Sequence, residues 1–92
     1  MATNTYQRAE GAVSAAVDGE TVVLSPTDMR YHGLNETAAA IWAELDRPLS
    51  IDDLVELLCD RYEVDAETCR RDVESCLTTL AEYGAVTVAT LS

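Results

Sequence analysis

The chain has 92 residues, the length of one small domain, and its 48% hydrophobic content is typical of a globular protein. Seventeen acidic residues against six basic ones give a formal net charge of -11, which argues against nucleic-acid binding because such a surface repels phosphate. No apolar run approaches the roughly 18 residues that a membrane span requires, and the N-terminus lacks the apolar region of a secretory signal. We therefore expect a cytoplasmic protein whose acidity either keeps it soluble or attracts a basic peptide.

The side chains capable of chemistry form no familiar catalytic or metal-binding motif. Cys59, Cys69 and Cys76 are an odd set without a CxxC pair, which is untypical of disulfide scaffolds and structural zinc sites. Cys69 and Cys76 share one predicted helix, where a rise of about 1.5 Å per residue separates them by roughly 10 Å, too far for a disulfide. The single histidine, His32, has no nucleophile motif around it. The sequence predicts no catalytic residue, no metal and no cofactor.

The first third of the chain has the pattern of antiparallel strands. Val13–Val17 and Glu20–Leu24 flank Asp18-Gly19, a favoured two-residue hairpin turn. Pro26 then breaks the second strand, and residues 29–34 can return as a third strand. A three-stranded antiparallel sheet is expected.

Three helices are predicted after the strands, each with a polar residue at its start. Asn35 caps the first, which runs to about Asp46; Ser50 caps the second, and Asp65 caps the third, which ends at Gly84. Their apolar faces repeat at three and four residues. These faces consist of Ala38, Ile41, Trp42 and Leu45; of Ile51, Leu54, Val55, Leu58 and Tyr62; and of Cys69, Val73, Cys76, Leu77 and Leu80.

Residues 85–91 are alternating and β-branched, which fits either a final strand or a frayed extension. The order of elements predicts an α+β fold, a three-stranded antiparallel sheet followed by three helices that cover one of its faces. We expect a single domain over residues 1–92 with an ordered core at about 12–88.

The junction of the third strand and the first helix, YHGLNETAAAIW from Tyr31 to Trp42, resembles the PqqD-like family. The similarity continues through LSIDDL from Leu49 and DVESCL from Asp72, and covers most of the chain from about Val13. The resemblance implies a winged-helix-like fold and a recognition element for ribosomally synthesised and post-translationally modified peptides (RiPPs). A stand-alone acidic member of this size is most similar to the leader-binding protein of lasso-peptide biosynthesis.

The resemblance also implies β-augmentation, in which the leader peptide adds a strand to the edge of the third strand and lies against the third helix. A proline at His32 is then expected to weaken binding by removing an edge amide. By position, the resemblance assigns peptide binding to Met29, Arg30, Tyr31, His32 and Gly33 on the strand and to Cys69, Asp72, Val73, Cys76, Thr79 and Leu80 on the helix.

The sequence therefore favours a binding protein over an enzyme, with a precursor leader peptide, a leader peptidase and a cyclase as its expected partners. A winged-helix regulator that reads DNA through its third helix is the alternative from another class, although the charge opposes it. An acyl or peptidyl carrier domain would use Ser50, but Leu49 precedes this serine where such carriers have Asp or Gly.

Overall fold

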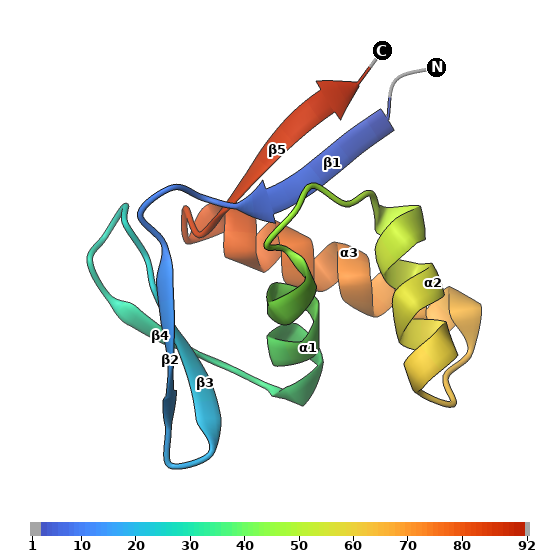
Figure 1. The fold of residues 1–92 in the computed structure, drawn as a ribbon, viewed down its shortest axis with the longest axis horizontal. Helices are drawn as coiled ribbons and strands as arrows, with labels where there is room; N and C mark the ends of the chain where they lie inside the picture. Colours follow the sequence, from blue (N-terminus) through green and yellow to red (C-terminus); the bar gives the residue numbers. More distant parts are fainter. Residues whose placement is uncertain (1–2, 92) are drawn as a thin grey trace.

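The computed structural model describes residues 3–91, which form two small antiparallel sheets and a layer of three helices (Figure 1). None of these helices is both long and apolar enough to cross a membrane. In chain order the elements are β1 (Thr3–Arg8), β2 (Val13–Val17), β3 (Glu20–Leu24), β4 (Tyr31–Leu34), α1 (Glu36–Glu44), α2 (Ile51–Arg61), α3 (Ala66–Glu82) and β5 (Val86–Leu91).

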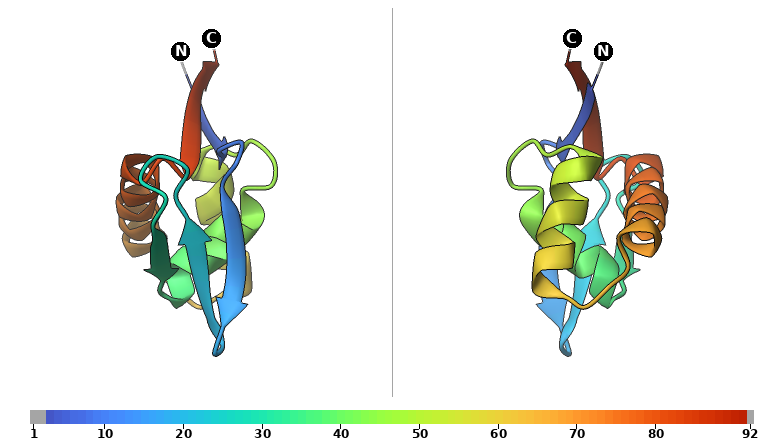
Figure 2. Two further views of the ribbon diagram at one scale, coloured as in Figure 1. Left: turned by 90° about the vertical axis from the view of Figure 1, so that its left-hand side faces the viewer. Right: turned by 90° about the vertical axis from the view of Figure 1, so that its right-hand side faces the viewer.

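The predicted three-stranded sheet is confirmed, with the strand order β2-β3-β4 and antiparallel pairing throughout. Asp18 and Gly19 have φ values of 52° and 82°, the left-handed pair that a type I′ hairpin turn requires. The helices lie behind one face of this sheet (Figure 2, left). The α+β class expected from the sequence is therefore correct.

The third strand is shorter than expected because its first two residues belong to a bulge. Ser25 donates its N–H to the Arg30 carbonyl, and Met29 donates its N–H to the Ser25 carbonyl, each with a nitrogen–oxygen distance of 2.9 Å. Met29 has a φ of 58°, so this arrangement is a G1 bulge with methionine in the place of the usual glycine. The bulge leaves Tyr31 as the first residue of β4.

All three helices begin at the predicted caps. The Asn35 side chain accepts from the Ala38 N–H over 2.8 Å, and Ser50 forms a reciprocal capping box with Asp53 at 3.1 Å in both directions. Asp65 accepts from the Thr68 N–H over 3.0 Å, and this bond lowers the pKa of the Asp65 carboxyl.

The apolar faces of the helices meet in one core, to which the central sheet contributes Val23. One assignment was wrong: Tyr62, placed on the apolar face of α2, is the C-cap of that helix and is 50% exposed. The core consists of Val23, Ile41, Trp42, Leu45, Leu49, Leu54, Val55, Leu58, Cys69, Val73, Leu77, Leu80, Ala85 and Val86.

A second sheet pairs the two ends of the described chain, β1 with β5. The sequence analysis assigned no element before Val13 and left the C-terminal strand open between two alternatives. Tyr6 exchanges two backbone hydrogen bonds with Leu49, at 2.7 and 3.0 Å, which attaches β1 to the segment before α2. The Arg8 guanidinium donates two bonds to the Trp42 carbonyl, at 3.0 and 2.9 Å, where a cation meets the negative end of α1.

Helix α3 ends in a Schellman motif that brings it close to the turn before β4. The Gly84 N–H donates to the Ala81 carbonyl and the Ala85 N–H donates to the Leu80 carbonyl, each at a distance of 3.0 Å. Gly84 has a φ of 75°, as this motif requires. A Cβ atom on Gly84 would overlap the Thr27 hydroxyl. Glycine is therefore required here both for the left-handed backbone and for the close approach.

Replacing Gly84 by alanine should destabilise the fold more than the same change at Gly19. Gly19 is also left-handed, at 82°, but has open space around its Cβ position. Gly19→Ala should therefore cost only the backbone penalty of about 1–2 kcal/mol, whereas in Gly84→Ala the Thr27 turn must also move. Thermal unfolding of both variants measures the difference, at about 4–8 °C per kcal/mol. Equal losses would show that the Thr27 contact does not constrain the structure.

Candidate functional site

The outer edge of β4 has unpaired backbone groups within the part of the chain that the structure describes. β4 is the last strand of its sheet and pairs only with β3. Since hydrogen-bonded pairs alternate along an antiparallel ladder, the Ser25–Arg30 bond makes Val23–His32 the next bonded pair. Tyr31 and Gly33 then direct their N–H and C=O groups away from the sheet.

This alternation corrects the expectation for a proline at His32. The His32 amide points toward β3, so a proline there would disrupt the pairing of β4 with β3 and would remove no N–H from the outer edge. The edge amides are those of Tyr31 and Gly33.

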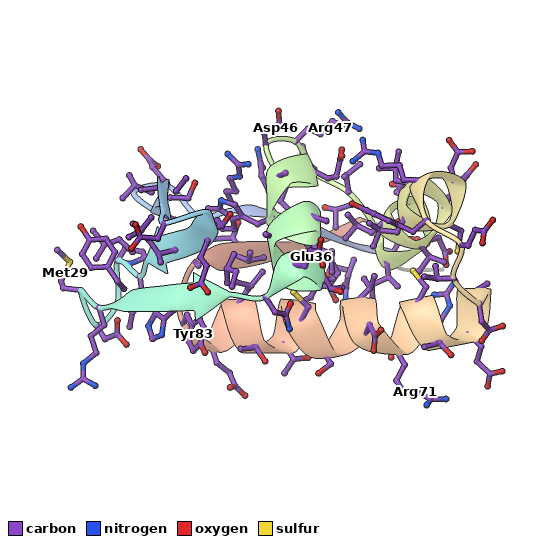
Figure 3. All side chains as sticks on the ribbon, turned by 90° about the horizontal axis from the view of Figure 1, so that it is seen from below. Met29, Glu36, Asp46, Arg47, Arg71 and Tyr83 are labelled. Atoms are coloured by element: carbon purple, nitrogen blue, oxygen red, sulfur yellow. The ribbon has the colours of Figure 1, made fainter. Side chains whose placement is uncertain are left out.

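The side chains of β4 alternate between two faces. His32 faces α3, where its ring stacks on Tyr83 with centroids 3.7 Å apart and an interplanar angle of 12°. Leu34 lies on the same face as His32, whereas the Tyr31 side chain lies on the opposite face and is 70% exposed. In Figure 3, Tyr83 lies between β4 and α3.

Polar contacts stabilise the turn before β4, and one of them joins it to the end of α3. The Ser25 hydroxyl donates to the Tyr83 carbonyl, and Asp28 lies 3.4 Å from the His32 imidazole. The backbone N–H of Arg30 donates to the Asp28 carboxylate over 3.0 Å and is the main reason why the pKa of Asp28 is lowered. These contacts position β4 beside the last turns of α3.

Between β4 and α3 lies an open groove of about 350 Å³, which we call the strand–helix groove. β4 supplies Gly33 and Leu34, and the start of α1 closes one end (Figure 3). The remaining lining residues are Asn35, Thr37 and Ala38 at the start of α1, and Asp72, Ser75, Cys76, Thr79, Leu80 and Tyr83 on α3.

A second cavity of about 260 Å³ continues past the end of β4 toward the start of α3. It shares Thr37 and Asp72 with the strand–helix groove, so the two are neighbours along one path. Much of its wall is apolar and comes from Ala40, Leu58, Tyr62, Val64 and Cys69. An extended ligand lying on β4 could therefore place a further apolar group here.

The charged groups that line the two cavities are Asp72 and Glu36, both of them carboxylates. The thiols contribute little reactivity. Burial raises the pKa of Cys76 to about 11, and burial together with a hydrogen bond to Cys59 raises the pKa of Cys69. Both thiols stay protonated at neutral pH and behave as small apolar groups. Within residues 3–91, no group of three His, Cys, Asp or Glu side chains could hold a metal ion.

The structure brings together only part of the site that the sequence analysis named. Gly33, Asp72, Cys76, Thr79 and Leu80 line the strand–helix groove. The others lie elsewhere: Cys69 lines the second cavity, Val73 is fully buried in the core, His32 supports Tyr83 from the strand, and Met29, Arg30 and Tyr31 lie outside both linings.

The sequence analysis missed six groove residues: Leu34, Asn35, Thr37, Ala38, Ser75 and Tyr83. Ser75 and Tyr83 could have been found, because Asp72, Cys76 and Thr79 follow a helical spacing that continues to Tyr83. The residues of α1 carry no comparable signal, since their position depends on how the helix packs.

The family whose description reads Coenzyme PQQ synthesis protein D (PqqD) matches residues 20–86. No curated protein matches the chain. Among solved structures, "TbiB1 in Complex with the TbiA(beta) Leader Peptide" is 30% identical, with a TM-score of 0.74 over 87% of this chain and 93% of that one. "Lasso peptide synthetase B1 complexed with the leader peptide" is 29% identical, with a TM-score of 0.75 over 89% of this chain and 96% of that one.

A third structure is similar in fold at 19% identity: the PqqD truncation of Methylobacterium extorquens PqqCD, a stand-alone RiPP recognition element. Its TM-score is 0.75 over 90% of this chain and 88% of that one. The family match spans the β3–β4 hairpin and all three helices, which are the elements that build the strand–helix groove. This chain belongs to the PqqD family.

Proposed function

We propose that this chain binds the leader region of a ribosomally made precursor peptide by β-strand addition to β4 and delivers it to a maturation enzyme of lasso-peptide biosynthesis. The observation that carries the proposal is the open Tyr31–Gly33 edge beside a groove. Two similar structures, each a complex with a leader peptide, support it.

Strand addition would use the four outward backbone groups of Tyr31 and Gly33. An antiparallel guest continues the pattern of the sheet, and its residue opposite His32 then points into the strand–helix groove, as does its residue opposite Leu34. The neighbouring guest residues point to the other face, beside Tyr31. In the leader segment paired with β4, every second side chain would therefore have to fit the strand–helix groove.

Antiparallel pairing also fixes the direction of the guest. β4 runs from Tyr31 toward Leu34 and the second cavity, so the N-terminal part of the leader would lie at that cavity. Asp72 lies where the two cavities meet, and a leader N–H donor or cation placed there would form a charge-assisted bond. We expect an apolar leader residue in the second cavity.

The free energies of binding show why leader side chains must fill both the strand–helix groove and the second cavity. Four backbone hydrogen bonds at a net value of about 0.5–1.5 kcal/mol each contribute about 2–6 kcal/mol. Two buried apolar side chains add about 1.5–3 kcal/mol each. Association costs at least about 4 kcal/mol, besides the ordering of a disordered peptide. Micromolar binding requires about -8 kcal/mol, so backbone pairing alone is insufficient and the apolar residues of the leader must carry much of the affinity.

The alternative functions have less support. A DNA-reading helix needs a cationic surface, but the net charge is -11 and the Arg70 side chain is paired with Asp52. A carrier domain would use Ser50, but Leu49 precedes this serine where such carriers have Asp or Gly. In the proposed function the protein performs no chemistry itself. It raises the effective concentration of the leader at a leader peptidase, with a cyclase as a further partner.

Isothermal titration with the leader peptide of the precursor from the same pathway tests the proposal directly. We expect binding at micromolar concentration or tighter, and none with a scrambled leader of equal composition. Failure to detect binding at high micromolar concentration would remove the leader-binding function.

The edge itself can be tested at Gly33. Gly33→Pro removes an outward N–H, while Gly33→Ala keeps it, and the Cβ position of Gly33 has open space around it. The proline variant should bind the leader about 3- to 10-fold more weakly, which corresponds to one net hydrogen bond. The alanine variant should bind nearly as well as the parent chain. Equal affinity of the two variants, with both folded by circular dichroism, would exclude pairing through this amide.

Alkylation of Cys76 can report whether a bound leader covers the strand–helix groove. Because burial raises the pKa of Cys76 to about 11, its alkylation by iodoacetamide should be slow at pH 8 and should accelerate as the pH rises toward that value. A bound leader should slow it further by covering the thiol. Mass spectrometry of the Cys76 peptide with and without leader measures both effects, and Cys59, which lies outside both grooves, is the internal control. A leader that binds without protecting Cys76 would place its contacts outside the strand–helix groove.

A further inference from the structure

Strand β5 has a second open backbone edge, on the ribbon that it forms with β1. Val88 lies opposite Tyr6, and Tyr6 directs its backbone groups outward to Leu49. In an antiparallel ladder the residue opposite such a position also points outward, and outward positions recur at every second residue. The N–H and C=O groups of Val86, Val88 and Thr90 therefore face away from β1.

Within residues 3–91 these groups have no backbone partner, because β5 is paired on one side only. Strand edges are usually protected by charge, by proline or by a bulge. β5 has the sequence VTVATL and pairs with β1 without interruption, so it carries none of these protections. Its edge is also longer than that of β4, which the bulge at Met29 limits to four residues.

The ribbon lacks the negative charge that covers the rest of the molecule. None of the 17 acidic residues lies in β1 or β5, and the last of them is Glu82. The ribbon projects away from the helices (Figure 1). Two copies of a chain with a net charge of -11 repel each other, and the repulsion falls as the distance between their charges grows. Contact through the ribbon therefore brings two copies together at a low electrostatic cost.

The edge of β5 is complementary to itself. When two copies pair antiparallel about a two-fold axis at Val88, this residue lies opposite its own copy, and Val86 lies opposite Thr90 of the second copy. All three outward residues then occupy hydrogen-bonded positions. Every open backbone group that they present gains a partner in this one register.

We propose that β5 is a contact between two copies of this chain, which pair edge to edge into a four-stranded sheet of the order β1-β5-β5-β1. The inference does not depend on leader binding, and the ribbon apart from Val86 lies outside residues 20–86, which match the PqqD family. The ribbon lies on the side of the molecule opposite the strand–helix groove, so both copies keep their β4 edges open (Figures 1 and 3). Such a dimer would offer two separate peptide sites.

Sedimentation velocity over a range of protein concentrations measures the association. Pairing that rests on backbone groups is weak, so we expect monomer at about 10 µM and dimer at roughly 500 µM. Added salt should favour the dimer, because it screens the repulsion between two acidic chains. Monomer at every concentration and salt would overturn the inference.

Proline variants identify the edge that pairs. Val88→Pro removes an outward N–H of β5, which an edge strand tolerates, whereas Val88→Thr keeps that N–H and the β-branched shape. Gly33→Pro makes the same change on the edge of β4. Val88→Pro should weaken dimerisation about tenfold or more, because each dimer loses two hydrogen bonds, and the other two variants should dimerise as the parent chain does. A dimer that Gly33→Pro dissociates and Val88→Pro leaves intact would assign the contact to β4 and contradict the proposal.

Disulfide trapping tests the register and does not require the proline variant to fold. Val88→Cys places two thiols on residues directly opposite each other, with Cα atoms about 5.5 Å apart, whereas Thr87→Cys places them on a diagonal at about 7–8 Å, too far for a disulfide. Oxidised glutathione should join two Val88→Cys chains through one disulfide and be reduced to two glutathione thiols. Intact mass measures the covalent dimer.

The parent chain, with Cys59, Cys69 and Cys76, and the Thr87→Cys variant are the controls for this trapping, and both should remain without an intermolecular disulfide. Equal cross-linking of Thr87→Cys and Val88→Cys would contradict the register. No cross-linking of Val88→Cys at roughly 500 µM would exclude the β5 contact.

Discussion

The groove depends on one junction, where the turn before β4 meets the end of α3. Gly84 has no side chain at the point where Thr27 approaches, and the Ser25 hydroxyl and the Tyr83 carbonyl hold the turn in place. The stacking of His32 on Tyr83 then sets the spacing between strand and helix. If this spacing closed, the guest side chains would have no pocket; if it widened, they would lose contact with α3. The open edge therefore gains specificity only through this junction.

An open strand edge carries the hazard of unwanted pairing. In this chain the G1 bulge at Met29 limits β4 to four residues, and within β4 the outward backbone groups are those of Tyr31 and Gly33. So short an edge binds weakly through its backbone, and a guest without suitable side chains gains little from it. The shortness of β4 and the side chains that line the groove thus act together in selecting a ligand.

Much of the fold could be predicted because its signals are local. Asn35, Ser50 and Asp65 cap the helices as expected, and Asp18-Gly19 forms the predicted turn. The missed strand β1 pairs with a segment some 80 residues away, a contact without a local signal. The candidate peptide-binding site was harder to predict from the sequence, because the face on which each strand side chain lies depends on the register of the strand. The bulge at Met29 sets that register, and it contains no glycine that would have revealed it.

The ribbon of β1 and β5 brings the first and last described residues together at the side of the molecule opposite the strand–helix groove (Figures 1 and 3). A fluorophore or an affinity handle joined near either of these residues would point away from a guest on β4. A linker joining them would need to bridge only a short span, so new termini could be opened in an exposed turn such as Asp18-Gly19. The geometry thus makes the domain a convenient module for sensors that report captured peptides.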